Sequence, residues 1–422
     1  MQERGEKPSL RRAGVALQHR DYRLFYFALL AAAIGSQLQA TANIIQIYDM
    51  THSAVHLGLT GLARGIPTFA FSLMGGVIAD RVDRRKLIMV TQAVNGLGAL
   101  LLGGLTATGQ IDVWHIYALM VLTGSLAALS SPARQAMVPN LVPRHHLLNA
   151  IALNSTVWQT ANIVGPSIAG VLIATFGLPS AYLGTGFAQL ITLSSLAVMR
   201  VGPIAGRTRE PALRSIGVGL AFMRQRSLIL ALLAMDAAAM LFGTYRALTP
   251  IFAEALGVGH EGVGLLLAAP GVGSLLGAAG VMAFGDFRYK GLAVIGGILA
   301  YCASLVVFAL SPWFPLSMAA SVALGFCDSL QSTPRNGIIA LLTPDEVRGR
   351  VSAFQYMLVN GMPSLGQTLS GGTSAIFGAP MALTIGAFAC AAVVLVITAA
   401  RPDLREERLG AVQAPRQEPA RA

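Results

Sequence analysis

Four ionisable residues lie inside long apolar segments, where a charge is costly to place. They are Arg64, Asp236, Arg246 and Asp328. Placing such a group at membrane depth costs roughly 2.5–3.5 kcal/mol even on lenient insertion scales, so residues of this kind usually face the protein interior and serve a function. An arginine there can bind an anionic or polar small molecule, and an aspartate there can take up a proton and become neutral. We therefore predict that Asp236 and Asp328 carry protons, and that Arg64 and Arg246 line a substrate cavity.

A structural ion pair is the alternative for each of these residues. Asp236 and Arg246 are ten residues apart, which puts them on one helical face but about 15 Å apart along the axis. They cannot pair with each other, so each needs a partner elsewhere. Asp328 and Arg335 are seven residues apart on one face of another segment, so Arg335 can be a neighbouring structural charge at the membrane edge.

Twelve long apolar segments must position these residues. With 54% hydrophobic and 12% charged residues and a mean hydropathy of +0.63, the chain is too apolar for a soluble domain of this length. Each segment can cross a hydrocarbon core, which needs about 20 helical residues. We predict an all-α membrane protein with transmembrane helices at 23–48, 53–79, 86–108, 112–134, 148–175, 179–199, 227–252, 260–284, 291–311, 314–338, 351–376 and 380–400.

The basic residues predict the orientation of these helices. If the twelve segments span the bilayer, 28 of the 30 Lys and Arg residues fall on one side, and the other two are Arg64 and Arg246. Lys and Arg stay in cytoplasmic loops, so both termini are expected to lie in the cytoplasm. The net charge of +11 is split among short segments rather than gathered on one surface, so we expect no nucleic-acid partner.

The chain also repeats itself. At an offset of 201 residues, Arg134 falls on Arg335, Gly165 on Gly366 and Gly177 on Gly378; upstream, at an offset of 206, Gly58 falls on Gly264 and Asp80 on Asp286. The two copies each contain six helices, and six is even, so both copies enter the membrane from the same side as a parallel repeat. We predict two pseudo-symmetric six-helix bundles around a central crevice that opens alternately to either side.

The expected domain organisation follows from this repeat. The charged stretch between the copies carries apolar residues on one helical face, which is typical of an amphipathic helix at the membrane surface. The predicted parts are a cytoplasmic N-tail at 1–22, an N-terminal bundle at 23–200, a cytoplasmic linker at 201–226, a C-terminal bundle at 227–400 and a cytoplasmic C-tail at 401–422.

A motif between the second and third segments resembles a known signature. The residues read GGVIADRVDRRK from Gly75 to Lys86. They resemble the signature of the major facilitator superfamily, in which a Gly, an Asp four residues on and several basic residues surround a second Gly. The matching residues are Gly76, Asp80, Arg81, Arg84 and Arg85, and Asp83 takes the place of the second Gly. Together with LQHRDYRLFY and QAMVPNLVPRHHLLNA, the motif resembles the branch of enterobactin exporters and macrolide efflux proteins.

The resemblance implies a conformational latch on the cytoplasmic side. In the superfamily the Asp of this motif holds neighbouring helix ends and lets go when the cytoplasmic side opens. The latch residues implied here are Gly76, Asp80, Arg81 and Arg84, with Arg134 as a candidate partner. The alternative for the arginines is that they only fix the topology.

A second motif lies in the fifth segment, at Gly165, Pro166 and Gly170. It resembles the Gly-Pro motif that the superfamily associates with exporters, although Ala161 stands where that motif has a Gly. Pro166 removes a backbone donor and bends the helix, while the glycines allow a close helix contact. Packing alone is therefore an alternative to a role in export.

Polar residues recur at helical spacing in two segments. The first and fifth segments carry Gln39, Asn43 and Gln46, and Gln159 and Asn162 beside Trp158. A polar face toward lipid is costly, so we expect these residues to line the substrate cavity. The alternative is hydrogen bonding between helices, worth about 0.6 kcal/mol per bond.

The residue patterns predict a secondary transporter. The resemblance implies a proton-coupled exporter of a small hydrophobic or amphipathic compound, such as a drug or siderophore, in the inner membrane of a bacterium. The expected partners are the lipid bilayer, the small molecule and protons; the proton gradient supplies the energy without a cofactor, and we expect a monomer. A proton-linked importer and a non-transporting receptor or scaffold remain the alternatives. The sequence has no G-x-x-x-x-G-K-[ST] loop for an ATP-driven pump and no convergent catalytic or metal-binding set, so we do not expect an enzyme.

Overall fold

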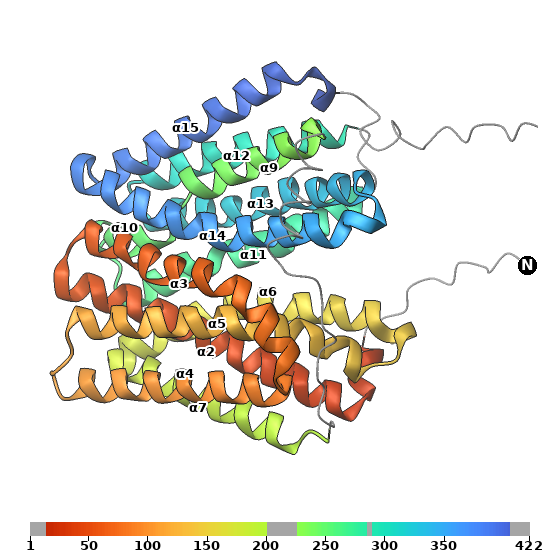
Figure 1. The fold of residues 1–422 in the computed structure, drawn as a ribbon. Helices are drawn as coiled ribbons and strands as arrows, with labels where there is room; N and C mark the ends of the chain where they lie inside the picture. The colour runs from red at the N-terminus through yellow and green to blue at the C-terminus, as the bar shows by residue number, and fades with distance from the viewer. Residues whose placement is uncertain (1–13, 201–225, 285–288, 406–422) are drawn as a thin grey trace, which may run out of the picture. The chain divides into compact units, whose positions relative to one another are not determined.

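The computed structural model describes residues 14–200, 226–284 and 289–405, and every regular element in these ranges is a helix (Figure 1). The long helices are α2 (Arg20–Thr51), α3 (Ala54–Arg81), α4 (Arg84–Ala107), α5 (Val113–Leu141), α6 (Leu147–Phe176), α7 (Leu178–Val198), α9 (Ser227–Phe242), α11 (His260–Phe284), α12 (Lys290–Leu310), α13 (Phe314–Leu342), α14 (Asp345–Phe377) and α15 (Ala379–Ala400). Short helices are η1 (Val15–Gln18), η2 (Arg144–His146), η3 (Arg246–Leu248), α10 (Thr249–Ala255) and η4 (Pro402–Arg405).

All twelve predicted segments are helical. Within the described residues, nine helical segments are long and apolar enough to cross a membrane. The three other long helices, α3, α13 and α14, contain 28, 29 and 33 residues, which is also enough for a hydrocarbon core about 30 Å thick at 1.5 Å per residue. The all-α membrane fold is therefore confirmed.

The seventh segment differs from its prediction because it is broken. It was expected to be one helix over 227–252, but α9 ends at Phe242, and η3 and α10 follow after a short non-helical stretch. Gly243 closes α9 by donating its backbone N–H to Ala239 O at 2.8 Å, and the Tyr301 hydroxyl donates to Gly243 O at 2.9 Å. A Cβ at Gly243 would lie 2.7 Å from Tyr301 Cε1, so a larger residue does not fit at the break.

The chain forms two compact units. The first comprises residues 1–46 and 66–208, and the second comprises residues 47–65 and 209–422. In the first unit α4 packs against α7 and α5, and in the second unit α13 packs between α11 and α12, with α15 beside α12 (Figure 1). The last turn of α2 and the first half of α3 thus belong with the second unit. The predicted linker lies almost wholly outside the described residues, so its amphipathic helix stays a prediction.

The two units repeat the same backbone contacts. Gly177 and Gly378, which are 201 residues apart, both end a long helix with a positive φ, of 79° and 80°. A Cβ at Gly165 of α6 would lie 3.3 Å from Ile34 O of α2, and a Cβ at Gly366 of α14 would lie 2.5 Å from Met240 O of α9. Ile34 and Met240 are 206 residues apart, which is the offset that the sequence repeat predicts for this region. The internal repeat is therefore present in the packing of each unit.

Gly366 and its neighbour Gly372 provide a matched test of this close packing. A Cβ at Gly366 would also lie 2.5 Å from Thr244 Oγ1, whereas a Cβ at Gly372 would meet nothing within 4 Å. Alanine favours a helix over glycine by about 1 kcal/mol, but overpacking costs about 1–3 kcal/mol. We expect Gly366→Ala to lower the thermal unfolding midpoint of the purified protein and Gly372→Ala to leave it unchanged or raise it. A Gly366→Ala variant as stable as the wild type would contradict the close contact between α14 and α9.

Candidate functional site

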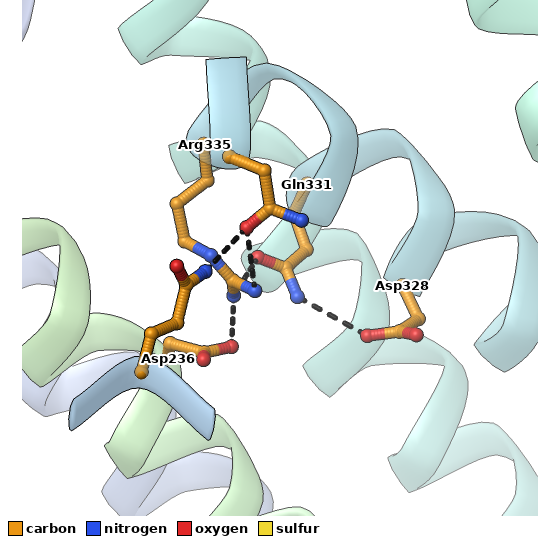
Figure 2. A network of polar contacts seen from close by, with 6 residues as sticks. Asp236, Asp328, Gln331 and Arg335 are labelled. Carbon is orange, nitrogen blue, oxygen red and sulfur yellow. Dashed lines mark hydrogen bonds and ion pairs between the residues drawn. The ribbon is translucent and has the colours of Figure 1, made fainter. Parts of the chain in front are cut away.

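The most deeply buried charges form an ion pair between α9 and α13. Arg335 Nη1 donates to Asp236 Oδ1, and the side chains are 3% and 1% exposed (Figure 2). Removing two charges from water costs several kcal/mol per ion, so such a pair needs further hydrogen bonds to be stable. The neighbouring polar residues of α13 supply them.

Gln331 connects this pair to a second carboxylate. Arg335 Nη1 also donates to Gln331 Oε1 at 3.0 Å, and Gln331 Nε2 donates to Asp328 Oδ1 at 3.1 Å (Figure 2). Gln331 and Arg335 are four residues apart on α13, so they are neighbours on one helical face. Asp328 lies within the electrostatic range of Arg335. The guanidinium of Arg335 therefore bonds the carboxylate of Asp236 and lies near that of Asp328. With both carboxylates ionised, the three side chains carry a formal charge of −1.

Two polar atoms of the ion pair have no hydrogen-bond partner among the described residues. They are Asp236 Oδ2 and Arg335 Nε, and both are buried. A buried acceptor without a donor costs about 1–3 kcal/mol, and more when it is charged. A proton on Asp236 would neutralise the excess charge of the network.

A cavity of about 400 Å³ lies beside this network, between α9, α13 and α14. Its lining residues are Met240, Asp328, Ser332, Arg335, Asn336, Ser352, Gln355 and Val359. Asp328 is exposed, whereas Asp236 is buried. Asn336 Oδ1 accepts from Gln355 Nε2 at 2.6 Å and from Arg335 Nη2 at 3.5 Å, so the polar network continues onto α14. The cavity thus reaches one carboxylate directly and the other through hydrogen-bonded side chains.

The structure brings together Asp236 and Asp328, which were predicted as proton carriers, but it places Arg246 elsewhere. The sequence indicated Arg335 only as a neighbouring charge at the membrane edge, whereas it is 3% exposed and binds Asp236. The sequence contained a signal for Arg335, because the repeat has an arginine at both equivalent positions, Arg134 and Arg335. The pairing itself depends on the approach of α9 to α13, which no local pattern shows.

The N-terminal copy of this site lacks the carboxylates. Arg134 Nη1 donates to Ser130 Oγ at 3.2 Å, which is the same four-residue contact that Arg335 makes with Gln331. The positions equivalent to Asp236 and Asp328 are occupied by Leu30 and Ala127. At these equivalent positions, the C-terminal copy has two acidic residues and the N-terminal copy has none.

The predicted latch can be traced only in part. The side chains of Gly76, Asp80 and Arg81 lie outside the described part of the chain, so a contact between Asp80 and Arg134 stays a prediction. Arg84 Nη1 donates to Ala136 O of α5 at 3.4 Å. Asp83, noted in the sequence only as a replacement for glycine, caps α4 by accepting from the backbone N–H groups of Arg85 at 2.9 Å and Lys86 at 3.3 Å. An Asp just before a helix is a common N-cap, and that signal was available in the sequence.

The polar face of α2 is used for helix packing. The Tyr182 hydroxyl of α7 lies 2.6 Å from Gln46 Oε1 and 3.1 Å from Asn43 Oδ1, and Gln46 Nε2 donates to Thr106 Oγ1 of α4 at 2.9 Å. Asn43, Gln46 and Gln39 are all buried. For Asn43 and Gln46 the structure favours the alternative of hydrogen bonding between helices over contact with a substrate.

The predicted residues of the fifth segment, which is α6, include some that are buried in helix contacts and some that are exposed. Asn162 accepts a hydrogen bond from Gln37 Nε2 of α2, and a Cβ at Gly165 would lie 2.4 Å from Gln37 Cβ. Gly165, Pro166 and Gly170 are buried, Gln159 is half-buried and Trp158 is 46% exposed. Gly165 therefore permits a close contact between α6 and α2, while Trp158 and Gln159 stay accessible.

The two remaining arginines lie in the second unit. Arg64 is exposed on α3 and Arg246 is half-buried at the start of η3. The two arginines lie within electrostatic range of each other. They form a second charged region in addition to the Asp236–Arg335 network.

A helical multi-pass fold with buried ionisable groups defines a membrane transport protein. The chain belongs to the transmembrane secretion effector family of the major facilitator superfamily, whose pattern matches residues 13–419. It is 25% identical over 390 residues to the enterobactin exporter EntS of Citrobacter koseri, covering 92% of this chain and 94% of that one. It is 26% identical over 358 residues to EntS of Shigella boydii serotype 18, covering 85% and 86%.

Solved transporters share the fold. A POT family transporter in complex with 5-aminolevulinic acid aligns with a TM-score of 0.71 at 11% identity, covering 92% of this chain and 97% of that one. A bacterial homologue of the human lysosomal transporter Spinster, in an inward-facing and occupied conformation, aligns with a TM-score of 0.68 at 13% identity, covering 92% and 98%. At these identities the likeness shows the fold alone.

Replacing one partner of the buried ion pair should destabilise the protein more than replacing both partners. Arg335→Met leaves Asp236 buried without its counter-charge, which costs about 3–5 kcal/mol, whereas replacing both partners by apolar residues is often neutral. We expect Arg335→Met to lower the thermal unfolding midpoint strongly and the double variant Arg335→Met/Asp236→Leu to recover most of the loss. The exposed Arg405 provides the control, because Arg405→Met should have little effect. If the shift of the unfolding midpoint in the double variant equals the sum of the shifts in Arg335→Met and Asp236→Leu, the two residues do not form a pair.

Proposed function

We propose that this protein is a proton-coupled exporter of a siderophore-like small molecule and works by alternating access in the bacterial inner membrane, with both termini in the cytoplasm. The relatives that cover nearly the whole chain are named as enterobactin exporters, which supports a siderophore-like substrate. The repeat of two six-helix copies supports alternating access, because transporters of this design rock two bundles about a central site.

The observation that carries proton coupling is that two carboxylates share one arginine. Asp236 and Asp328 together exceed the charge of Arg335 by one, so the network can accept a single proton and become neutral. Asp328 meets the cavity and receives the proton first in this proposal. Gln331 accepts from Arg335 and donates to Asp328, and its amide can rearrange when either carboxylate gains or loses the proton.

Protonation then changes which carboxylate holds Arg335. When the proton passes on from Asp328 to Asp236, Asp328 becomes ionised again and Asp236 becomes neutral. The neutral Asp236 holds the guanidinium less strongly, which frees Arg335 to turn toward the ionised Asp328. Because Asp236 is on α9 and Asp328 is on α13, this exchange loosens the contact between two helices. A local proton can in this way favour one arrangement of the C-terminal copy over another.

The test measures enterobactin release from bacteria that lack their own exporter and express this chain. We expect export that an uncoupler abolishes, and we expect Asp236→Asn and Asp328→Asn to reduce it to the level of cells without the chain. Asn preserves the shape of each side chain but cannot carry the proton. Ser332→Ala, which changes a non-titrating residue of the same cavity, is the matched control and should retain export.

Two results would contradict the proposal. Export that continues unchanged with the uncoupler would exclude proton coupling. Enterobactin release equal to that of cells without the chain, from wild-type protein present in the membrane, would exclude the proposed substrate.

A further inference from the structure

Arg64 and Arg246 approach the same stretch of α14 from two neighbouring segments. A Cβ at Gly65 of α3 would lie 2.6 Å from Ser364 Cβ, and a Cβ at Gly366 would lie 2.5 Å from Thr244 Oγ1, just before η3. Arg64 directly precedes Gly65, and Arg246 follows Thr244 by two residues. The two arginines therefore flank one turn of α14, and η3 also packs against α14.

Both arginines lie at a similar depth in their segments. Arg64 is ten residues from Ala54, the first residue of α3, and Arg246 is nine residues from Ala255, the last residue of α10. At 1.5 Å per residue these separations are roughly 15 Å and 13 Å, about half of a hydrocarbon core. Lipid head groups lie at the membrane surface, so this depth favours a small solute over a lipid as the ligand.

The side chains are accessible and carry the same charge. Arg64 is exposed and Arg246 is half-buried, although arginines at this depth avoid lipid and face the protein interior or water. The two arginines lie within electrostatic range of each other. An anionic group can bind two guanidinium groups at once, because the planar fork of Arg fits two oxygen atoms of one anionic group.

The break in the seventh segment is an independent indication of a binding site. Arg246 begins η3 directly after the non-helical residues that follow α9. Transporters commonly build their substrate sites from interrupted transmembrane helices, because irregular backbone at membrane depth is tolerated where it lines a cavity. The break therefore places an arginine where a substrate is expected to meet the protein.

We propose that Arg64 and Arg246 form an anion subsite that binds a delocalised oxyanion of the transported molecule, such as a carboxylate or a catecholate. This inference rests on the proposed function, since it takes the ligand to be the exported substrate. The residues of this subsite differ from Asp236, Asp328 and Arg335, which carry the proton in the proposed function. Substrate selection and proton coupling thus depend on different residues of the same unit.

Two dyes with the same ring system and opposite charge provide the test. Fluorescence anisotropy measures the binding of carboxyfluorescein, which is anionic, and rhodamine 6G, which is cationic, to the purified full-length protein in neutral detergent. We expect the wild type to prefer carboxyfluorescein. Arg64→Gln and Arg246→Gln should each weaken its binding by about tenfold or more, as for loss of a hydrogen bond to a charged group, and should not weaken the binding of rhodamine 6G.

Control variants separate this subsite from general charge effects. Arg405→Gln removes an exposed arginine outside the long helices and should leave both affinities unchanged. Arg64→Lys and Arg246→Lys keep the charge but lose the planar fork, so they should keep the preference for the anionic dye at reduced affinity. Equal loss of both dyes in the Gln variants, or an equal effect of Arg405→Gln, would overturn the proposal.

Competition in the wild type keeps the proposal testable if the Gln variants do not fold. Benzoate should displace carboxyfluorescein, whereas benzamide, which has a similar shape without the charge, should not. Displacement by both compounds alike would overturn the anion subsite. Displacement by a small fraction of phosphatidylglycerol in the micelle would overturn it in favour of a lipid site.

Failure of the anion subsite can be distinguished from failure of the proposed function. The dye assay contains no proton gradient and no transport step. Uncoupler-sensitive enterobactin export together with no charge preference for the dyes would overturn the anion subsite alone. The opposite combination is a charge preference for the dyes that depends on both arginines together with enterobactin export that the uncoupler does not reduce. That combination would overturn proton coupling alone.

Discussion

The proposed proton site depends on one electrostatic constraint: the buried guanidinium of Arg335 must balance the buried carboxylate of Asp236 and that of Asp328, which meets the cavity. Burial of Asp236 and Arg335 is tolerable only if α9 and α13 stay close enough for the two side chains to bond. Arg335 must also reach Gln331, whose place one turn earlier on α13 supplies a second acceptor. Because the local charge does not balance, the site responds to the gain or loss of a single proton. A fully paired site would gain rigidity but would lose that response.

The internal repeat shows how this property arose from a common helix packing. Both copies close the contact between their first and fifth helices with a glycine, at Gly165 and Gly366, and both carry an arginine that bonds one turn back. The acidic residues are present only in the second copy. The shared features therefore belong to the common architecture, and at these positions the carboxylates are specific to the second copy. This difference between the copies supports a proton-sensitive site in the C-terminal copy. In the N-terminal copy, no acidic residue stands at the equivalent positions.

The sequence predicted those parts of the structure that depend on local properties. The length of an apolar run is local, so all twelve helical segments were predicted, as was the repeat. The break at Gly243 was missed because it depends on the Tyr301 hydroxyl from α12, and the pairing of Asp236 with Arg335 was missed because it requires two distant helices to meet. A polar face was recognised on α2, but its partner Tyr182 lies on α7, and only the tertiary contact distinguishes packing from a cavity lining. Site prediction from sequence thus identified the unusual charges and could not identify their partners.

The most direct measurement is the infrared absorption of protonated carboxylic acids in the purified protein as the pH is lowered. Above the pH range in which exposed carboxylates take up protons, we expect a carboxylic acid C=O band in the wild type that decreases in Asp236→Asn and in Asp328→Asn and is lost in the double variant. A band of unchanged intensity in the double variant would show that the titrating acid lies elsewhere, and the Arg335 network could then not be the place where the proton is held.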